Sequence, residues 1–424
     1  MKRILILANN CLSDTNANGR TLANMLVGYP KECIAQFALR ADNPNFDCCE
    51  NYFCVSDSEA LRAFVKGARV GRRLEKQEGR TAVAGAEKKR ARTALTMLLR
   101  NLVWNSGCWK KGGFLAFIEN FSPEVLLLQA GDCAFLFRLA RRLAKEYRIP
   151  LVIYNSEGYY FKDYDYFHAQ GLAHLCYPLF RRQLCRQFRK TMRAASYAVY
   201  NCTALQKAYA AAFSTPSKVI YTATQLQPCA APSENHPPRI SYYGNLGVGR
   251  HETLLAVAKT LRELTDDCCI DVYGKAPSEE IEQALKACPQ IRFHGFVSYA
   301  QVREGMHGSD ILLHVESFDS FYREDSKYAF STKIADSLAC GTCFLLFAPS
   351  EFACAQYLRE NKAAYVVSDL SALKETLDRL LHSPDERKRY VRNALRLAEK
   401  NHSARANAAR FAEILNNAET EDKT

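Results

Sequence analysis

The sequence predicts two α/β domains, each built on a doubly wound parallel β-sheet. Short apolar segments, several of them apolar at every position, alternate with longer segments of helical periodicity. This alternation stops once, at 227–238, in a stretch rich in proline and polar residues, and then resumes. The length of 424 residues also fits two domains better than one. We therefore expect two Rossmann-like domains that face each other across a cleft.

The individual elements follow from the same patterns. Residues 135–147, 251–264 and 278–287 have helical periodicity. Predicted strands cover 3–8, 33–39, 52–55, 124–129, 151–154, 197–200 and 218–221, and then 239–243, 270–273, 291–294, 310–315, 343–347 and 364–367. We accordingly expect an N-terminal domain at 1–226, a linker at 227–238, a C-terminal domain at 239–400 and a helical tail at 401–424.

The positive charge is concentrated in two segments. The formal net charge is +12, yet 62–111 carries 14 Lys and Arg against 3 Glu, and 181–193 carries six cations and no acid. The first segment predicts a basic insertion at about 62–113, and both predict an anionic partner. Within the insertion, one side of a possible helix gathers Leu95, Leu98, Leu99, Leu102 and Val103. Around and beyond it lie Lys88, Lys89, Arg90, Arg92, Arg100, Trp104 and Trp109. The pattern suits an interfacial membrane helix or, equally, a helix packed on its own domain with a solvated basic face.

Cysteine usage and apolar run lengths indicate the compartment. The 17 cysteines are odd in number and follow no disulfide framework, which predicts reduced thiols in the cytoplasm. No apolar run is long enough to span a membrane, and the one at 4–8 is strand-sized. Cys340 and Cys343 have no second pair at zinc-site spacing, and a D-x-D such as Asp163-Tyr164-Asp165 holds a metal ion only in a fold with a single nucleotide-binding domain, so we expect no metal site.

Three loops that follow predicted strands have residues suited to binding a nucleotide. The first contains Gly19 and Arg20, where a glycine that begins a helix lets backbone approach a phosphate or sugar; an ordinary capped turn would look the same. The second runs from Gly244 and Asn245 through three glycines to Arg250, a candidate diphosphate cradle. The first loop does not have the dinucleotide pattern G-x-G-x-x-G, which argues against a dehydrogenase.

The third loop opens a predicted helix with two hydroxyl residues, Ser331 and Thr332. Lys333 follows one residue inside the helix, and Asp336 lies one turn beyond Thr332 on the same face. A helix N-terminus would bind phosphate, and a carboxylate one turn further would accept hydrogen bonds from ribose. A capped helix with an acid in its first turn is the structural alternative.

In this order, the motifs resemble the retaining GT-B glycosyltransferases of the family 4 group ("glycosyl transferases group 1"), found in bacterial surface-polysaccharide synthesis. The resemblance is strongest from 240 to about 358 and weaker over 1–221. The family's G-x-L loop with its following basic residue is matched by Gly244 to Arg250, its F-x-G-x-V strand end by Phe293 to Val297, and its S-K-x-x-E-x-x-A-x-G signature by Thr332 to Gly341.

The resemblance implies roles for these residues. Arg250 would touch the donor diphosphate, and Gly295, Phe296 and Val297 would line the base. Ser331 and Thr332 would stand where amides hold phosphate, and Asp336 would replace the ribose-binding glutamate.

Two positions depart from the family. The earlier glutamate falls on Tyr328, so Glu316 or Asp319 is the substitute, and the first domain has Ser156 or Glu157 in place of a histidine. Our catalytic candidates are therefore Glu157, Glu316 and Asp319.

The resemblance implies a hexosyltransferase that moves a sugar from a nucleoside diphosphate sugar to a glycan or lipid-linked acceptor held by the N-terminal domain. Configuration would be retained, with no metal or other cofactor. The protein would be cytoplasmic and peripheral on the inner face of the cell membrane, bound to its anionic surface. One alternative is a sugar-nucleotide epimerase of similar shape, and another is an inactive membrane- or nucleic-acid-binding protein. No recognisable nucleic-acid module surrounds the basic segments, so we expect no nucleic acid partner.

Overall fold

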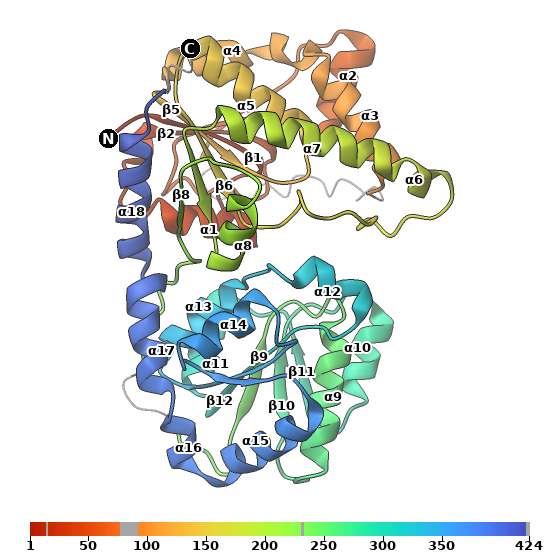
Figure 1. The fold of residues 1–424 in the computed structure, drawn as a ribbon, viewed down its shortest axis with the longest axis vertical. Coiled ribbons are helices and arrows are strands. Elements are labelled where there is room, and N and C mark those ends of the chain that lie inside the picture. The colour runs from red at the N-terminus through yellow and green to blue at the C-terminus, as the bar shows by residue number, and fades with distance from the viewer. Residues whose placement is uncertain (14–15, 77–91, 230–232, 421–424) are drawn as a thin grey trace. The chain divides into compact units, whose positions relative to one another are not determined.

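The computed structural model describes residues 1–13, 16–76, 92–229 and 233–420, and these form two compact units (Figure 1). The N-terminal unit comprises Met1–Tyr221 together with Ala404–Thr424, and the C-terminal unit is Thr222–Ser403. Each unit is an α/β fold with a mostly or wholly parallel sheet, which confirms the predicted fold class.

The N-terminal sheet has eight strands in the order β4-β3-β2-β1-β5-β6-β7-β8. Seven run parallel, and β4 pairs antiparallel with β3 at one edge. The sequence patterns predicted every strand of this sheet except β4. The strands are β1 (Ile4–Asn10), β2 (Ile34–Arg40), β3 (Asn51–Cys54), β4 (Arg72–Leu74), β5 (Val125–Gln129), β6 (Leu151–Asn155), β7 (Tyr197–Tyr200) and β8 (Ser217–Val219).

Helices surround this sheet. They are α1 (Ala17–Met25), η1 (Lys31–Cys33), α2 (Asp57–Lys66), α3 (Ala94–Asn105), η2 (Cys108–Gly112), α4 (Phe114–Phe121), α5 (Ala134–Tyr147), α6 (Leu172–Leu175), α7 (Tyr177–Ala194), α8 (Thr203–Ala210) and α18 (Ala404–Asn417). The last of these lies within the helical tail expected at 401–424 and is helical over Ala404–Asn417. Helix α18 returns to the N-terminal unit and packs beside α1, because its apolar stripe, which includes Phe411 and Leu415, completes the core of that unit.

The two tryptophans of the basic insertion lie in the core of the N-terminal unit. Trp104 stacks on Phe135 with ring centroids 4.6 Å apart, and Trp109 stacks on Phe37 at 5.3 Å. The indole N–H of Trp104 donates to Asp57 at 2.8 Å. Neither ring is therefore available as an interfacial anchor, which corrects that part of the membrane hypothesis.

Two cations of the insertion are also paired within the fold, whereas the membrane hypothesis placed them on the surface. Arg100 is mostly buried and its Nε donates to Asp57 at 2.7 Å, while Arg92 pairs with Asp132. Lys88, Lys89 and Arg90 lie outside the described residues. Helix α3 nonetheless exposes Leu99 and Leu102 to solvent.

The C-terminal sheet has six parallel strands in the order β11-β10-β9-β12-β13-β14. All six coincide with predicted strands within two residues. They are β9 (Ile240–Tyr243), β10 (Ile270–Tyr273), β11 (Ile291–Gly295), β12 (Ile311–Val315), β13 (Cys343–Phe347) and β14 (Tyr365–Val367). The accompanying helices are α9 (Arg250–Arg262), α10 (Glu279–Lys286), α11 (Tyr299–His307), α12 (Ser320–Ser326), α13 (Thr332–Ala339), α14 (Ala353–Glu360), α15 (Leu370–His382), α16 (Pro384–Lys388), α17 (Val391–Leu397) and the π-helix η3 (Ala398–His402).

The segment expected to be a linker at 227–238 packs against the C-terminal unit where the structure describes it. The Cys229 N–H donates to the Cys340 carbonyl at 2.9 Å, and the side chain of Asn235 donates to Asp310 at 2.8 Å. Residues 230–232 lie outside the described part. The unit boundary accordingly falls earlier, after Tyr221 rather than at 226.

Buried His402 lies where the chain enters and leaves the C-terminal unit. Its Nδ1 is 2.7 Å from the Thr222 carbonyl oxygen, which can only accept, so Nδ1 donates; Tyr357 lies 2.9 Å from Nε2. The Thr224 N–H donates to the His402 carbonyl at 2.8 Å. Burial lowers the pKa of His402 to about 4, despite the opposing bond to Thr222. This histidine is therefore neutral at physiological pH.

Within the described ranges, no helix is long and apolar enough to cross a bilayer. All 17 cysteines are free thiols. Burial raises the pKa of both Cys340 and Cys343 to about 12, so this pair is poorly suited to redox chemistry.

We predict that His402 makes stability depend on pH. The unfolded chain takes up a proton near pH 6.5 and the folded chain only near pH 4, so stability falls as the pH is lowered through this window. Over the whole window, the free energy of unfolding should fall by about 3 kcal/mol. Thermal melting across this range should show a steep decline for the parent and for His382→Gln, an exposed control. His402→Gln should be less stable at pH 7 but have a flatter profile. Equal slopes in all three proteins would contradict the assignment.

Candidate active site

The C-terminal sheet has a topological switch point between β9 and β12. These strands are neighbours, and the chain builds the sheet outward from them in opposite directions. The loops that follow them therefore diverge at the carboxyl edge, where open α/β sheets bind ligands. The loop after β9 contains the predicted Gly244, Asn245 and Arg250, and the loop after β12 contains Glu316 and Asp319.

Local geometry explains the glycines in the loop after β9. A side chain at Gly249, whose φ is 70°, would overlap the Ser317 hydroxyl of the facing loop. The Asn245 Oδ1 accepts the Gly247 N–H at 2.9 Å, which folds the loop back on itself. The two loops thus touch through backbone and a small side chain, which keeps the switch point narrow.

Arg250 and Glu316 form a buried ion pair across this switch point. The Arg250 Nη2 lies 2.7 Å and its Nε 2.9 Å from Glu316 Oε2, while His314 Nε2 lies 3.1 Å from Oε1. Burial raises the pKa of the Glu316 carboxyl, but the Arg250 charge and the His314 bond outweigh it and hold the pKa below its usual value. Glu316 is therefore an ionised carboxylate whose charge is neutralised inside the fold.

This pairing changes what the two residues can do. Glu316 is 1% exposed and has partners on both oxygens, so it is poorly placed to exchange protons with a substrate. Arg250 likewise has its charge compensated before any diphosphate binds. The second catalytic candidate of this loop, Asp319, is exposed and caps α12 by accepting the Phe321 N–H at 2.9 Å.

Helix α13 begins as the sequence predicted. Ser331 is its N-cap and accepts the Lys333 N–H at 3.2 Å, and Thr332 is the first helical residue. Lys333 and Thr332 are both half-buried in the first turn. The arrangement places a cation and helix-terminal amides at one point, which favours an anionic ligand.

Asp336 connects α13 to two other segments. Its Oδ1 accepts a hydrogen bond from the Thr224 hydroxyl at 2.7 Å and lies 3.3 Å from the Tyr299 hydroxyl. Tyr299 is the first residue of α11, which follows the predicted base-lining residues Gly295, Phe296 and Val297 after the N-cap Ser298. Gly295 has a φ of 75°, and Phe296 is 82% exposed, the largest exposure among the described large apolar side chains. Two of the predicted donor-binding segments are thus brought together through one carboxylate.

The N-terminal unit also has a switch point, between β1 and β5. Gly19 lies in the first turn of α1, where a side chain would overlap the Cys11 carbonyl and the Ser13 N–H of the loop after β1. Arg20 follows it and is half-buried. Glu157 is exposed, two residues beyond the end of β6 at the same edge. Each predicted residue of this unit therefore lies at the carboxyl edge of its sheet.

Sequence reasoning missed three polar residues at this edge. Asp132 follows β5, is 5% exposed, and accepts from Arg92 and from Tyr166 at 3.3 Å. Asn155 ends β6 and Asn201 follows β7, both almost fully buried. In the part of the chain that the structure describes, neither polar atom of the Asn155 amide, nor the Asn201 Oδ1, has a hydrogen-bond partner. Their position directly after predicted strands was the signal that could have identified them.

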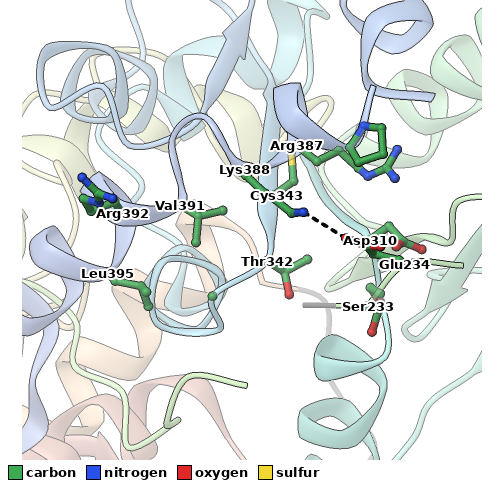
Figure 2. Close-up of a pocket in the computed structure, with 13 residues that line it drawn as sticks. Ser233, Glu234, Asp310, Thr342, Cys343, Arg387, Lys388, Val391, Arg392 and Leu395 are labelled. Atoms are coloured by element: carbon green, nitrogen blue, oxygen red, sulfur yellow. Dashed lines mark hydrogen bonds and ion pairs between the residues drawn. The ribbon is translucent and has the colours of Figure 1, made fainter. Parts of the chain in front are cut away.

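A separate cavity of about 340 Å³ lies at the opposite edge of the C-terminal sheet (Figure 2). Asp310 and Thr342, which precede β12 and β13, line it together with α16 and α17. Several of its charged groups are bonded within the unit: Lys388 pairs with Glu234 at 2.9 Å, Asp310 accepts the Arg239 N–H at 2.7 Å, and Arg387 donates to the Leu380 carbonyl at 2.7 Å. We interpret it as part of the scaffold rather than as the active site.

The predicted acidic pair Asp163 and Asp165 belongs to the loop before α6. Asp165 bonds His174 at 3.0 Å and the Phe167 N–H at 3.0 Å. Among the described residues, no group of three or more His, Cys, Asp or Glu side chains could hold a metal ion.

Comparison with known proteins agrees with this fold. Residues 250–413 match the model of a family described as glycosyl transferase-like. The matched segment begins at Arg250 and includes α13. A search of curated protein sequences finds no significant match. The structure is similar to that of HepE from Anabaena in complex with UDP and glucose, with a TM-score of 0.63, 11% identity, and coverage of 98% of this chain and 100% of that one.

Two further solved structures are similar over their whole length. One is the lipopolysaccharide outer core galactosyltransferase WaaB, with a TM-score of 0.59, 11% identity and coverage of 97% and 99% of the two chains. The other is sucrose-phosphate synthase from Thermosynechococcus elongatus, with a TM-score of 0.61, 10% identity and coverage of 98% of both chains. The chain therefore has the GT-B fold of glycosyltransferases, and residues 250–413, which span most of the C-terminal unit and part of α18, match a glycosyl transferase-like family.

We predict that removing one partner of the Arg250–Glu316 pair destabilises the protein strongly, whereas replacing both does not. Arg250→Met leaves a buried carboxylate without its counter-charge and should lower the free energy of unfolding by about 3–5 kcal/mol. The double variant Arg250→Met/Glu316→Leu removes both charges and should recover much of that loss.

Urea unfolding measures the effect, with Lys374→Met, an exposed paired cation, as the control. Because the folded pKa of Glu316 is depressed, the contribution of the pair should be present above the ordinary glutamate pKa and disappear as the pH falls through the depressed value. If Arg250→Met were as stable as Arg250→Met/Glu316→Leu, the unpaired Glu316 carboxylate would not be the source of the instability, and the prediction would be wrong.

Proposed function

We propose that this protein is a hexosyltransferase that moves a sugar from a nucleoside diphosphate sugar to a glycan or lipid-linked acceptor. The observation that carries the proposal is the glycosyl transferase-like match at 250–413, which includes α13 and the start of α9 at the switch point. Neighbouring structures contain UDP and UDP-glucose, which makes uridine donors the first to test.

In this proposal the donor diphosphate binds at the start of α13. Lys333 and the amides that follow Ser331 supply positive potential where the leaving group develops negative charge. Because protein groups supply this potential, the proposed transfer needs no metal ion. As a separate part of the proposal, the configuration at the anomeric carbon of the sugar is retained. Gly244 and Asn245 shape the floor of the crevice, while Arg250 holds Glu316 and positions the loops.

The ribose and base lie toward α11 in this proposal. Asp336 receives the ribose hydroxyls in addition to its bonds with Thr224 and Tyr299. The base stacks near the exposed Phe296, with backbone contacts from Gly295 and Val297. The segment from β11 to α11 and the start of α13 together form the nucleoside half of the site.

The acceptor binds at the carboxyl edge of the N-terminal sheet in this proposal. The amides of Asn155 and Asn201 are buried and have unmatched polar atoms among the described residues, and carbohydrate hydroxyl groups can satisfy both donors and acceptors. Asp132 and Glu157 provide carboxylates at the same edge for acceptor hydroxyls. The free thiols suit a reducing, cytoplasmic compartment.

The first test is donor binding at Lys333. A donor nucleotide present at 100 times its Kd should stabilise the parent by about 2.7 kcal/mol. Thermal shifts with UDP-, GDP- and dTDP-sugars identify the donor, and release of nucleoside diphosphate on addition of acceptor glycans measures turnover. Lys333→Ala should lose most of the nucleotide shift while melting like the parent without nucleotide.

Lys374→Ala, an exposed lysine on α15, is the matched control. Equal nucleotide shifts in the two lysine variants would exclude Lys333 from the donor site. If no nucleotide sugar stabilised the parent, the proposed reaction itself would be wrong. Turnover undiminished by EDTA is the expected result for metal independence.

The second test concerns Asp336 and the ribose. A hydrogen bond to a charged group is worth about 1.5–3 kcal/mol, so the parent should bind UDP at least about tenfold more tightly than its 2′-deoxy or 3′-deoxy analogue. Asp336→Asn keeps the shape and removes the charge, and should narrow this difference. Calorimetric titration of the three nucleotides into the parent, Asp336→Asn and the exposed control Asp378→Asn gives the comparison. Unchanged discrimination in Asp336→Asn would place the ribose elsewhere.

A further inference from the structure

Thr224 is a buried threonine close to the point where the chain enters the C-terminal unit. It is 7% exposed, and its backbone N–H donates to the His402 carbonyl at 2.8 Å. The same residue forms an isolated parallel bridge with Ser403, where the chain leaves the unit. Because these bonds fix the backbone of Thr224, its short β-branched side chain has little freedom to move. Any group that its hydroxyl bonds is therefore held at a defined position.

The hydroxyl of Thr224 is directed at Asp336. Its Oγ1 accepts the Leu226 N–H at 2.9 Å and lies 2.7 Å from Asp336 Oδ1. Because an N–H can only donate and a carboxylate oxygen can only accept, the hydroxyl proton must lie between Thr224 and Asp336. A hydrogen bond to a carboxylate is about twice as strong as one between neutral groups. This bond joins α13 to a residue 112 positions earlier, outside the motif that contains Asp336.

One oxygen of Asp336 receives both of the hydrogen bonds that the described residues supply to its carboxylate. The Tyr299 hydroxyl also lies against Oδ1, at 3.3 Å. Oδ2 accepts no hydrogen bond from any described residue, yet it is not sealed from solvent, although Asp336 as a whole is only 4% exposed. The terminal torsion of an aspartate is broad by itself, so two donors on one oxygen are what fix the carboxylate. The structure therefore presents one held oxygen and one open oxygen.

We propose that Thr224, assisted by Tyr299, is a positioning residue that turns Oδ2 of Asp336 toward the ribose hydroxyls of the donor nucleotide. This role rests on the proposed binding of ribose by Asp336 and adds the residues on which that binding depends. Thr224 itself touches no substrate. A carboxylate that is fixed before the nucleotide arrives loses no rotational freedom on binding, so its bonds to ribose contribute their full strength. A bond that only tied the chain entry to α13 would support the fold without affecting how ribose is recognised.

The test is calorimetric titration of UDP, 2′-deoxy-UDP and 3′-deoxy-UDP into the parent, Thr224→Val and Thr224→Ser. The parent should bind UDP at least about tenfold more tightly than its deoxy analogues. Thr224→Val keeps the shape of the side chain but has no proton to donate, so this ratio should fall below about threefold. Thr224→Ser retains the hydroxyl and should keep most of the ratio. A purely structural loss would weaken the binding of all three nucleotides equally and leave the ratio unchanged.

Thr260→Val is the matched control, because Thr260 is also buried in the C-terminal unit and its hydroxyl donates to the Ala256 carbonyl at 3.1 Å. This variant should keep the ratio of the parent. Tyr299→Phe removes the second donor from a partly exposed side chain and should narrow the ratio less than Thr224→Val does. Should Thr224→Val fail to fold, an unchanged ratio in Tyr299→Phe would overturn the proposal.

The outcomes distinguish this positioning role from the proposed function. If the parent binds UDP no more tightly than its deoxy analogues, the ribose role of Asp336 and the positioning role of Thr224 are both wrong. If the parent discriminates and Thr224→Val discriminates equally well, the ribose role stands and positioning by Thr224 is overturned. A ratio that falls in Thr224→Val and falls as far in Thr224→Ser would also overturn it, because the hydroxyl would then not be the cause.

Discussion

The buried Arg250–Glu316 pair is the interaction on which the geometry of the candidate site depends. It joins the loops that follow β9 and β12, the two strands from which the C-terminal sheet is built outward. Gly249 and Ser317 can approach so closely only because the neighbouring charges hold the loops together and glycine adds no side chain. Pairs of this kind contribute little net stability over an apolar contact, but loss of one partner leaves a charge in a site that cannot solvate it. Selection of loop geometry, rather than added stability, is therefore the physical effect of this pair.

The same pair divides the site into a fixed part and a part suited to ligands. Since Arg250 and Glu316 neutralise each other, the switch point itself presents little net charge to a diphosphate. The start of α13 is different: Ser331 caps the helix and Lys333 adds a cation in the first turn. In the proposed reaction, leaving-group charge therefore develops against α13, and α9 provides the rigid wall beside it.

Local patterns predicted the fold well wherever burial and periodicity agree. Strand β13 is apolar throughout, and β1 and β12 are apolar except for Asn9, Asn10 and His314, as expected for strands covered on both faces. Strand β4 reads Arg-Arg-Leu and forms because it pairs with β3 at an edge. In α3 the buried stripe is Ala94, Met97, Asn101 and Trp104, and its polar member bonds α5 and α7. The hydrophobic pattern of the sequence had instead indicated a face of Leu95, Leu98, Leu99, Leu102 and Val103. The motif positions of the site were likewise predictable, but their partners were not, because Arg250 meets a residue 66 positions away and Asp336 meets Thr224 at a separation of 112.

Within the N-terminal unit, the segment between β6 and α6 links helix α7 to the proposed acceptor edge. At one end it follows Asn155, and Tyr166 within it bonds Asp132 beside the β1–β5 switch point. At the other end Asp165 bonds His174 of α6, and the Lys162 carbonyl accepts from Tyr177 and Arg181 of α7. The segment is therefore anchored at both ends, which in the proposed reaction would hold an acceptor sugar at this edge in a fixed position.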